Sequence, residues 1–189
     1  MKRSVVWVLG VCVLMAASAV DARAQMTMGT FKGFLTGHVG ALTGGDVTNE
    51  RTVAGASVSV HEATGWGAEI DFGRSTDVTA GSQLLDLTTY VVNAAWVKPT
   101  GVLRPFASAG AGIFQVDGCI SPCGAAPRSY DLGFSVGGGT FITVTDYAGF
   151  RADARYFFSP ADHPELRRPD DVKFWRVSVG ATFMWSILP

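Results

Sequence analysis

The sequence predicts an all-β fold, an eight-stranded antiparallel up-and-down transmembrane β-barrel with short periplasmic turns and longer extracellular loops. In residues 147–158, Arg151, Asp153 and Arg155 occupy one phase of a two-residue alternation, whereas the opposite phase carries Ala, Phe and Tyr. A similar division recurs in about eight segments, which indicates strands with one face toward a polar lumen and the other toward lipid. No helix-length apolar run follows residue 24. Only helices and closed barrels span a bilayer with all backbone polar groups paired, so we expect strands to make the crossing.

The N-terminal residues have the layout of a secretory signal peptide. Basic residues 2–3 precede an apolar run over residues 5–20, and residues 22–24 form a small-x-small cleavage site. The apolar run is too short for a good transmembrane anchor. We therefore assign residues 1–24 to a cleaved signal peptide. Residues 25–189 form a single barrel domain in this interpretation, since no linker or charge run divides them.

Composition agrees with a membrane barrel. Charged residues make up 16% of the chain, below the quarter that is usual in soluble domains, whereas hydrophobic residues reach 48%. The net charge of −1 argues against a nucleic-acid partner. The predicted location is therefore the outer membrane of a Gram-negative-type cell, with the lipid bilayer as the main environment.

The strands follow one another as a meander, and none of the residues on their outward phase is charged. These residues are Phe31, Gly33, Leu35, Gly37, Val39 and Ala41 in the first strand; Ala54, Ala56, Val58 and Val60 in the second; Trp66, Ala68, Ile70 and Phe72 in the third; Tyr90, Val92, Ala94 and Trp96 in the fourth; Ala107, Ala109, Ala111 and Ile113 in the fifth; Leu132, Phe134, Val136 and Ile142 in the sixth; and Trp175, Val177, Val179, Ala181, Phe183 and Trp185 in the eighth. Residues 147–158 form the seventh strand. Glycines blur the phase of the fifth and sixth strands, where they can mark a bulge or corner.

Connections alternate in length, as an up-and-down barrel requires. Short periplasmic turns are expected at 62–65, 99–102 and 145–146, and longer extracellular loops at 43–51, 74–83, 117–129 and 159–170. Both termini are then periplasmic. In that orientation aromatic residues form two girdles at the headgroup levels, with Trp66, Trp96 and Trp185 at the inner rim and Tyr90, Tyr156 and Trp175 toward the outer rim.

Charged residues on the inward phase predict a lumen charge network. Its expected members are Lys32, Glu69, Asp71, Asp131, Arg151, Asp153, Arg155 and Arg176. The third and seventh strands lie opposite each other in an eight-stranded barrel, whose interior is only wide enough for side chains to fill it. We expect a plug of crossed salt bridges. The alternative is that the same charges line a gated ion path.

Cysteine and histidine residues indicate neither a metal site nor a cofactor. Cys119 and Cys123 lie in a loop of an exported chain, where a disulfide is the default expectation. His38 and His61 point inward at different heights, and His163 lies in the last loop, so a metal would lack ligands.

Several segments resemble the small eight-stranded outer-membrane barrels of the OmpA/OmpX type. The resemblance covers the whole mature chain and is carried by residues 65–73 (GWGAEIDFG), 104–106 (RPF) and 149–156 (GFRADARY). Residues 178–185 (SVGATFMW) look like the terminal signal that the barrel-assembly machinery reads in this family. The sequence departs from the family in its tail, because residues 186–189 follow the final aromatic residue, which is commonly the last one.

We expect a structural or surface-interaction role, without enzymatic activity, for a monomeric barrel. Its loops are the expected contact surface for an unidentified surface ligand, in particular the loop with the two cysteines and the charged residues 159–169. The runner-up is a narrow pore for ions or small solutes.

Two further alternatives remain open at this point. Some small outer-membrane barrels modify lipid A, and His61 shares its face with Ser57 and Ser59, but this patch points into the lumen. A secreted lipocalin-like barrel would invert every inward and outward assignment. The scarcity of Lys and Glu on the polar phase argues against that fold.

Overall fold

The computed structural model describes residues 31–45, 47–80, 83–120, 124–125, 129–159 and 173–187. The predicted signal peptide, residues 1–24, lies outside the described residues. Within the described residues no helix is long and apolar enough to cross a membrane.

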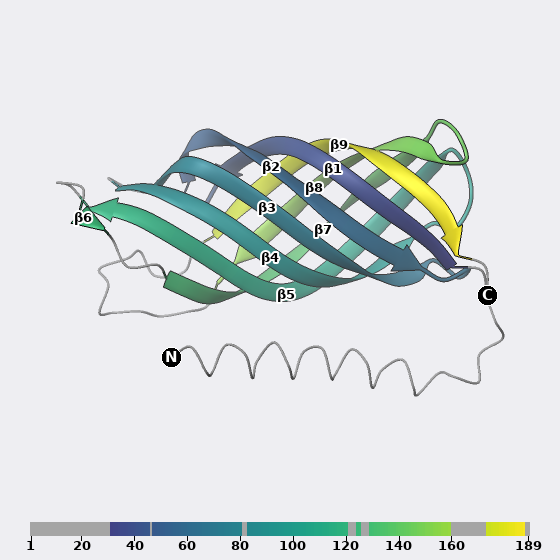
Figure 1. The fold of residues 1–189 in the computed structure, drawn as a ribbon, viewed down its shortest axis with the longest axis horizontal. Helices are drawn as coiled ribbons and strands as arrows, with labels where there is room; N and C mark the ends of the chain where they lie inside the picture. The colour runs from purple at the N-terminus through teal and green to yellow at the C-terminus, as the bar shows by residue number, and fades with distance from the viewer. Residues whose placement is uncertain are drawn as a thin grey trace. The chain divides into compact units, whose positions relative to one another are not determined.

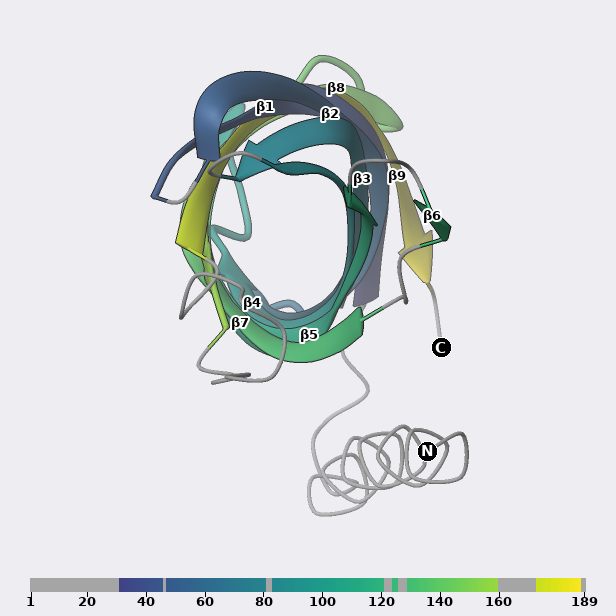
Figure 2. The ribbon, with the colours of Figure 1, turned by 90° about the vertical axis from the view of Figure 1, so that its left-hand side faces the viewer.

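Eight long strands and one short strand make up the described fold. They are β1 (Phe31–Gly44), β2 (Val47–His61), β3 (Trp66–Ala80), β4 (Gln83–Val97), β5 (Leu103–Ile120), β6 (Gly124–Ala125), β7 (Ser129–Thr143), β8 (Ala148–Phe158) and β9 (Lys173–Ile187). Successive long strands pair antiparallel, and β1 pairs with β9. Seen end on, the ribbons therefore close into a ring (Figure 2). The predicted eight-stranded antiparallel barrel is confirmed, with the two residues of β6 added to β5.

Tilted strands wind around this barrel (Figure 1), and they extend into three of the segments predicted as loops. The loops expected at 43–51 and 74–83 are wrong in extent, because β1 and β2 are separated only by residues 45–46 and β3 and β4 only by residues 81–82. The loop expected at 117–129 is also too long, because β5 continues to Ile120 and β6 lies within that range. Gly44 and Gly45 have φ angles of 70° and 63°, which allow the tight reversal. The strands continue because buried apolar residues of this end, such as Val53 and Val78, still face inward.

The inward and outward phases follow the prediction. Along β8 the inward residues are buried from Gly149 to Phe157, and the outward ones are half-buried or exposed. The exterior carries large exposed apolar residues, for example Ile70 at 64% and Val179 at 59%. Such a surface suits the hydrocarbon region of a bilayer, and it excludes the inverted, lipocalin-like arrangement.

The interior of the barrel has three layers. One apolar cluster fills the end near the short turns and contains Phe34, Val97, Phe106, Phe141 and Met184. A larger apolar cluster fills the opposite end and contains Leu42, Val53, Val78, Leu87, Val91, Phe114, Val116, Phe157 and Phe174. Buried charged residues lie between them along β3, β8 and β9. The lumen is therefore polar mainly in its middle.

Inward glycines make room for the largest interior side chains. A Cβ on Gly73 would lie 2.8 Å from Nη1 of Arg176, and one on Gly133 would overlap the ring of Phe114. In a barrel this narrow, a large residue on one strand requires a small one nearby. This requirement explains why Gly73 and Gly133 stand at inward positions, where they interrupt the alternation of polar and apolar residues.

Candidate functional site

The middle layer is a network of three arginines and three carboxylates. Arg151 Nη1 lies 2.6 Å from Glu69 Oε2, and Arg151 Nε lies 2.9 Å from Asp153 Oδ2. Arg155 Nη2 lies 2.5 Å from Glu69 Oε1. Arg155 thereby connects β8 to β3 across the lumen, as expected for strands on opposite sides of the ring.

The network continues onto β9 through Arg176. Arg176 Nη2 donates to Asp71 Oδ2 at 2.9 Å, and its Nη1 lies 2.8 Å from Asp71 Oδ1 in an ionic contact that is not aligned as a hydrogen bond. Arg155 Nη1 also lies 3.7 Å from Asp71. Three positive and three negative side chains are joined in this way, so the connected group carries no net charge.

Neutral polar side chains complete the charge network. Ser178 Oγ donates to Asp153 Oδ1 at 2.6 Å, and Arg151 Nη1 donates to Ser57 Oγ at 3.1 Å. Asn93 Nδ2 donates to Glu69 Oε1 at 3.3 Å and accepts through Oδ1 from Ser135 at 2.7 Å. The strands β2, β4 and β7 therefore contribute to the network as well as β3, β8 and β9. Charges buried in this way need such partners, because an unpaired buried ion is strongly disfavoured.

The apolar layers contact the charged layer directly. The guanidinium carbon of Arg151 lies 4.4 Å from the ring centre of Phe106 and 5.1 Å from that of Phe141. That of Arg176 lies 5.0 Å from the ring centre of Phe157, in the other cluster. Aromatic rings attract cations through their faces, so both clusters help to hold the arginines in place.

Two predicted members of the network lie elsewhere. Lys32 is on the inward phase of β1 but is exposed, at the end of the strand. Asp131 is 6% exposed and lies on β7 opposite Phe114 in the register, near the far apolar cluster. The ion pairs described above do not include either residue.

The predicted girdle residues all lie on the outward phase. Trp66 and Trp96 are register partners near the short turns, and Trp185 is partner to Gly33 close to the same end. Tyr156 and Trp175 are partners toward the other end, with ring centres 5.2 Å apart. Tyr90 pairs with Phe72, six positions along β3 from Trp66, and is therefore nearer the middle of its strand.

The remaining sequence candidates give no metal centre. The predicted Cys119–Cys123 disulfide and His163 lie outside the residues whose side chains are described. In the described residues no group of three His, Cys, Asp or Glu side chains could hold a metal ion. His38 is buried on the lumen side of β1.

His61 and Ser59 form a buried pair. His61 Nδ1 lies 3.2 Å from the carbonyl of Gly65, which can only accept, so this nitrogen carries the proton. Nε2, 3.0 Å from Ser59 Oγ, then accepts from the hydroxyl. Both side chains are only 2% exposed, and the ring of Phe34 packs edge-on against His61 at 5.4 Å. Serine and base are adjacent, but a substrate has no open approach to them.

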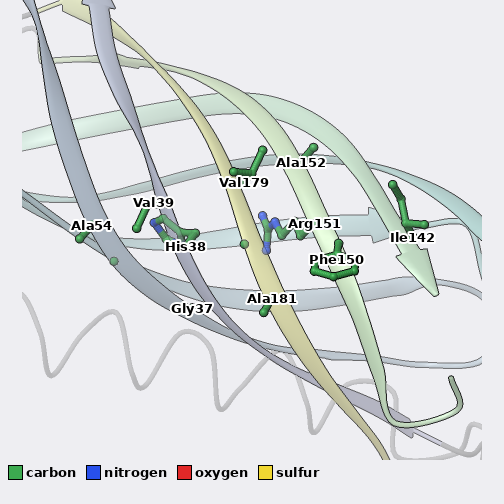
Figure 3. Close-up of a pocket in the computed structure, with 12 residues that line it drawn as sticks. Gly37, His38, Val39, Ala54, Ile142, Phe150, Arg151, Ala152, Val179 and Ala181 are labelled. Atoms are coloured by element: carbon green, nitrogen blue, oxygen red, sulfur yellow. The ribbon is translucent and has the colours of Figure 1, made fainter. Parts of the chain in front are cut away.

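A recess of about 740 Å³ lies where β1, β8 and β9 carry small residues (Figure 3). Outward residues such as Gly37, Ala152 and Ala181 line it, and His38 and Arg151, whose side chains are buried on the lumen side, are also among the lining residues. The recess thus lies along the seam where the first and last strands of the chain pair.

Arg104 is a buried charged residue that sequence reasoning missed. Its side chain is 6% exposed, and its Nε donates to the carbonyl of Lys98 at 2.9 Å. The two-residue alternation could have identified it, since Arg104 shares the inward phase of β5 with Phe106 and Ser108.

Comparison with known proteins finds solved structures with a similar fold, but no family model and no curated sequence that matches. No protein-family model matches the chain, and no curated protein sequence matches it. Among solved structures, Neisserial surface protein A (NspA) has a TM-score of 0.65 at 15% identity, over 82% of this chain and 98% of that one. The N-terminal β-barrel domain of Pseudomonas aeruginosa OprF has a TM-score of 0.55 at 15% identity, over 85% and 100%. Ail, the attachment invasion locus protein of Yersinia pestis, has a TM-score of 0.55 at 16% identity, over 84% and 100%.

At these identities the likeness shows the fold alone. It agrees with the closed ring, the apolar exterior and the antiparallel register found in the structure. The chain has the fold of the small eight-stranded outer-membrane barrels of the OmpA/OmpX type.

Proposed function

We propose that this protein is an integral outer-membrane barrel with a plugged lumen, which serves as a structural scaffold or a surface-interaction protein. The observation that carries the proposal is the neutral network of Glu69, Asp71, Arg151, Asp153, Arg155 and Arg176 between two apolar layers. An ion that crossed this lumen would have to separate buried ion pairs and pass two layers that are filled mainly by apolar side chains.

The proposal is tested by recording single-channel conductance of the refolded mature chain in a planar bilayer. We expect no conductance steps from the folded barrel. A variant with Arg151→Ala and Phe106→Ala removes one member of the charged layer and one of the apolar layer that contacts it, and we expect it to conduct. Phe150→Ala is the matched control, because it shortens an exposed outward residue next to Arg151. Reproducible steps from the unchanged protein would overturn the plug.

A narrow pore is the second candidate. Several guanidinium nitrogens of the network make no hydrogen bond to a described protein atom, among them Arg151 Nη2 and Arg155 Nε. If the network rearranged, these N–H groups could donate hydrogen bonds to water or to anions that pass through the lumen. The same conductance recording separates the two candidates.

We infer no enzymatic role. The Ser59–His61 pair lies inside the barrel at the turn end, whereas lipid A occupies the opposite, outer leaflet in the proposed orientation. Both side chains are buried. A lipid A-modifying enzyme would need its nucleophile and base open to the bilayer.

The surface role rests on the loops at the far end of the barrel. Residues 160–172, which carry most of the charged fourth loop, lie outside the described residues. Ail, with a similar fold, was solved in complex with the heparin analogue sucrose octasulfate. By analogy we propose that the loops of this chain contact a surface ligand, and that the barrel is a monomer inserted after cleavage of residues 1–24. Residues 178–185 are the proposed signal for the barrel-assembly machinery.

A further inference from the structure

A second recess, with a volume of about 480 Å³, lies at the turn end of the barrel. Its lining combines residues that face the lumen, such as Phe34, with outward residues such as Trp185. Its lining includes Lys32, Phe34, Arg104, Asp146, Tyr147 and Trp185. We propose that this recess binds a phosphate group, with Arg104 and Lys32 as its cations. The site is separate from the central network and goes beyond the scaffold role proposed above.

Arg104 is the reason to expect an anion. The arginines of the central network each lie within 4.0 Å of a carboxylate, whereas no described carboxylate lies that close to Arg104. Its Nε is bonded to the carbonyl of Lys98, and its guanidinium carbon lies 5.0 Å from the ring centre of Phe34. Neither contact uses the two Nη groups. A cation that is 6% exposed and has no counterion among the described residues is costly, and a bound anion would remove that cost.

The charges around the recess favour an anion as well. Lys32 contributes an exposed second cation from the start of strand β1, where it pairs with Ser186 on β9. Asp146 is the one carboxylate in the lining, so two positive charges face one negative charge. Residues 99–101, in the turn between β4 and β5, line the same space.

The donor groups of the two cations, and the position of the recess near the tryptophan residues, favour phosphate over other anions. A guanidinium presents parallel N–H groups that match two phosphate oxygens, and an ammonium group adds a point charge. Trp185 lines the recess, and Trp66 and Trp96 lie near the same end of the barrel. Tryptophan rings settle at the headgroup level of a bilayer, where lipid phosphates lie. The phosphate could therefore belong to a phospholipid headgroup or to a free phosphate compound in the periplasm.

The test uses ¹⁵N-labelled mature chain refolded in dodecyl maltoside, a detergent without phosphate. Inorganic phosphate is added at constant ionic strength against chloride, and the Arg104 Nε–H signal and the backbone amides of Gly101 and Thr143 are followed by NMR. We expect saturable shifts of these signals. Arg104→Gln should weaken binding about tenfold or more, as loss of a charge-assisted hydrogen-bonding group does. Arg104→Lys should restore some of it, and Lys32→Gln should weaken it several-fold.

Lys98→Gln is the matched control, because it removes a neighbouring positive charge whose side chain does not line the recess. It should bind phosphate like the unchanged protein. Shifts that are linear in phosphate concentration, or that are equal in the Arg104→Gln variant, would overturn the site. So would an affinity that falls as much with Lys98→Gln as with Lys32→Gln, because this would indicate general attraction by surface charge.

A second arm identifies the source of the phosphate. The chain is placed in nanodiscs of phosphatidylglycerol without inorganic phosphate. If the Arg104 Nε–H signal already lies at its phosphate-bound position, the ligand is a lipid headgroup. If the signal stays at the free position and moves when phosphate is added, the ligand is a soluble phosphate compound. A signal that moves in neither the micelle nor the nanodisc would refute phosphate binding, whatever the role of the lumen.

Discussion

Single residues of the central network serve more than one partner. Arg151 meets Glu69 and Asp153, and its guanidinium also packs on the ring of Phe106. Removing such a residue leaves carboxylates buried without their countercharge, which costs much more than the pair contributes over an apolar replacement. The importance of the network for stability is therefore clearest when one member is deleted.

Arg151→Ala is expected to lower the free energy of unfolding by about 3 to 5 kcal/mol. The measurement is urea unfolding of the refolded barrel in detergent or lipid. Arg74→Ala is the control, because Arg74 is exposed and lies 3.7 Å from Asp86. An exposed pair of this kind contributes about 0 to 1 kcal/mol. Equal losses in the two variants would argue against a stabilising network.

For single residues, the sequence predicts which face of the strand a side chain lies on better than it predicts which residue that side chain contacts. Alternation places Glu69, Asp71 and Arg155 in the lumen, because each sits on the same phase as its charged neighbours. It does not reveal which carboxylate meets which arginine, since that depends on the register and stagger of strands far apart in the chain. It also missed Arg104, because its neighbours on the inward phase, Phe106 and Ser108, are uncharged and no run of charges marks that phase.

Among the elements, the pairing of β1 with β9 closes the barrel. Gly33 and Gly37 both lie on the outward phase of β1, opposite Trp185 and Ala181 respectively. A Cβ on Gly33 would overlap the indole ring of Trp185, whereas one on Gly37 would meet nothing within 4 Å. Trp185 therefore covers the seam at the place where Gly33 leaves room for it.

Gly33→Ala should displace the Trp185 indole and lower the free energy of unfolding by about 1 to 3 kcal/mol, as overpacking does. Gly37→Ala should be neutral or stabilise the barrel by up to about 1 kcal/mol, because it only restricts the unfolded chain. Urea unfolding followed by tryptophan fluorescence compares the two variants. A larger loss for Gly37→Ala than for Gly33→Ala would show that Trp185 does not pack on the seam as described.

The sequence places the strands but not their far ends. The polar residues 48–50 (Thr-Asn-Glu) interrupt the apolar alternation and fall within the loop predicted at 43–51. A strand that continues beyond the bilayer no longer needs an apolar outer face, so Glu50 can be exposed within β2. Alternation alone cannot distinguish such an extension from a loop, and the inward residues Val53, Val78 and Leu87 were the better guide.

For the whole molecule, the distribution of apolar side chains determines whether the exterior is stable in water or in lipid. Large apolar residues are exposed around the ring, including Val92 at 54% and Phe183 at 54%. A continuous apolar surface of this kind is not stable in water. For the interior, the sequence predicts a polar lumen with a salt-bridge plug, but it does not identify the two apolar layers. Alternation alone does not assign a phenylalanine to the inward face where its neighbours are alanine or glycine.

The mature chain is expected to sediment with membranes after washing at alkaline pH and to require detergent for extraction. The reason is the exposed apolar exterior, which must stay covered by acyl chains or detergent. Fractionation followed by immunoblotting is the measurement. A folded chain that stays in the detergent-free supernatant would contradict the membrane placement.

The division of charge between the strands has a consequence for assembly. Within the network, β3 contributes two carboxylates, whereas β8 contributes two arginines and one carboxylate and β9 contributes one arginine. The network residues of the N-terminal half therefore carry two negative charges, and those of the C-terminal half carry a net of two positive charges. Neither half can neutralise itself as an isolated hairpin or half-barrel. Each half can enter the hydrocarbon region without uncompensated charge only when the other half arrives, so incomplete barrels are disfavoured and closure becomes cooperative.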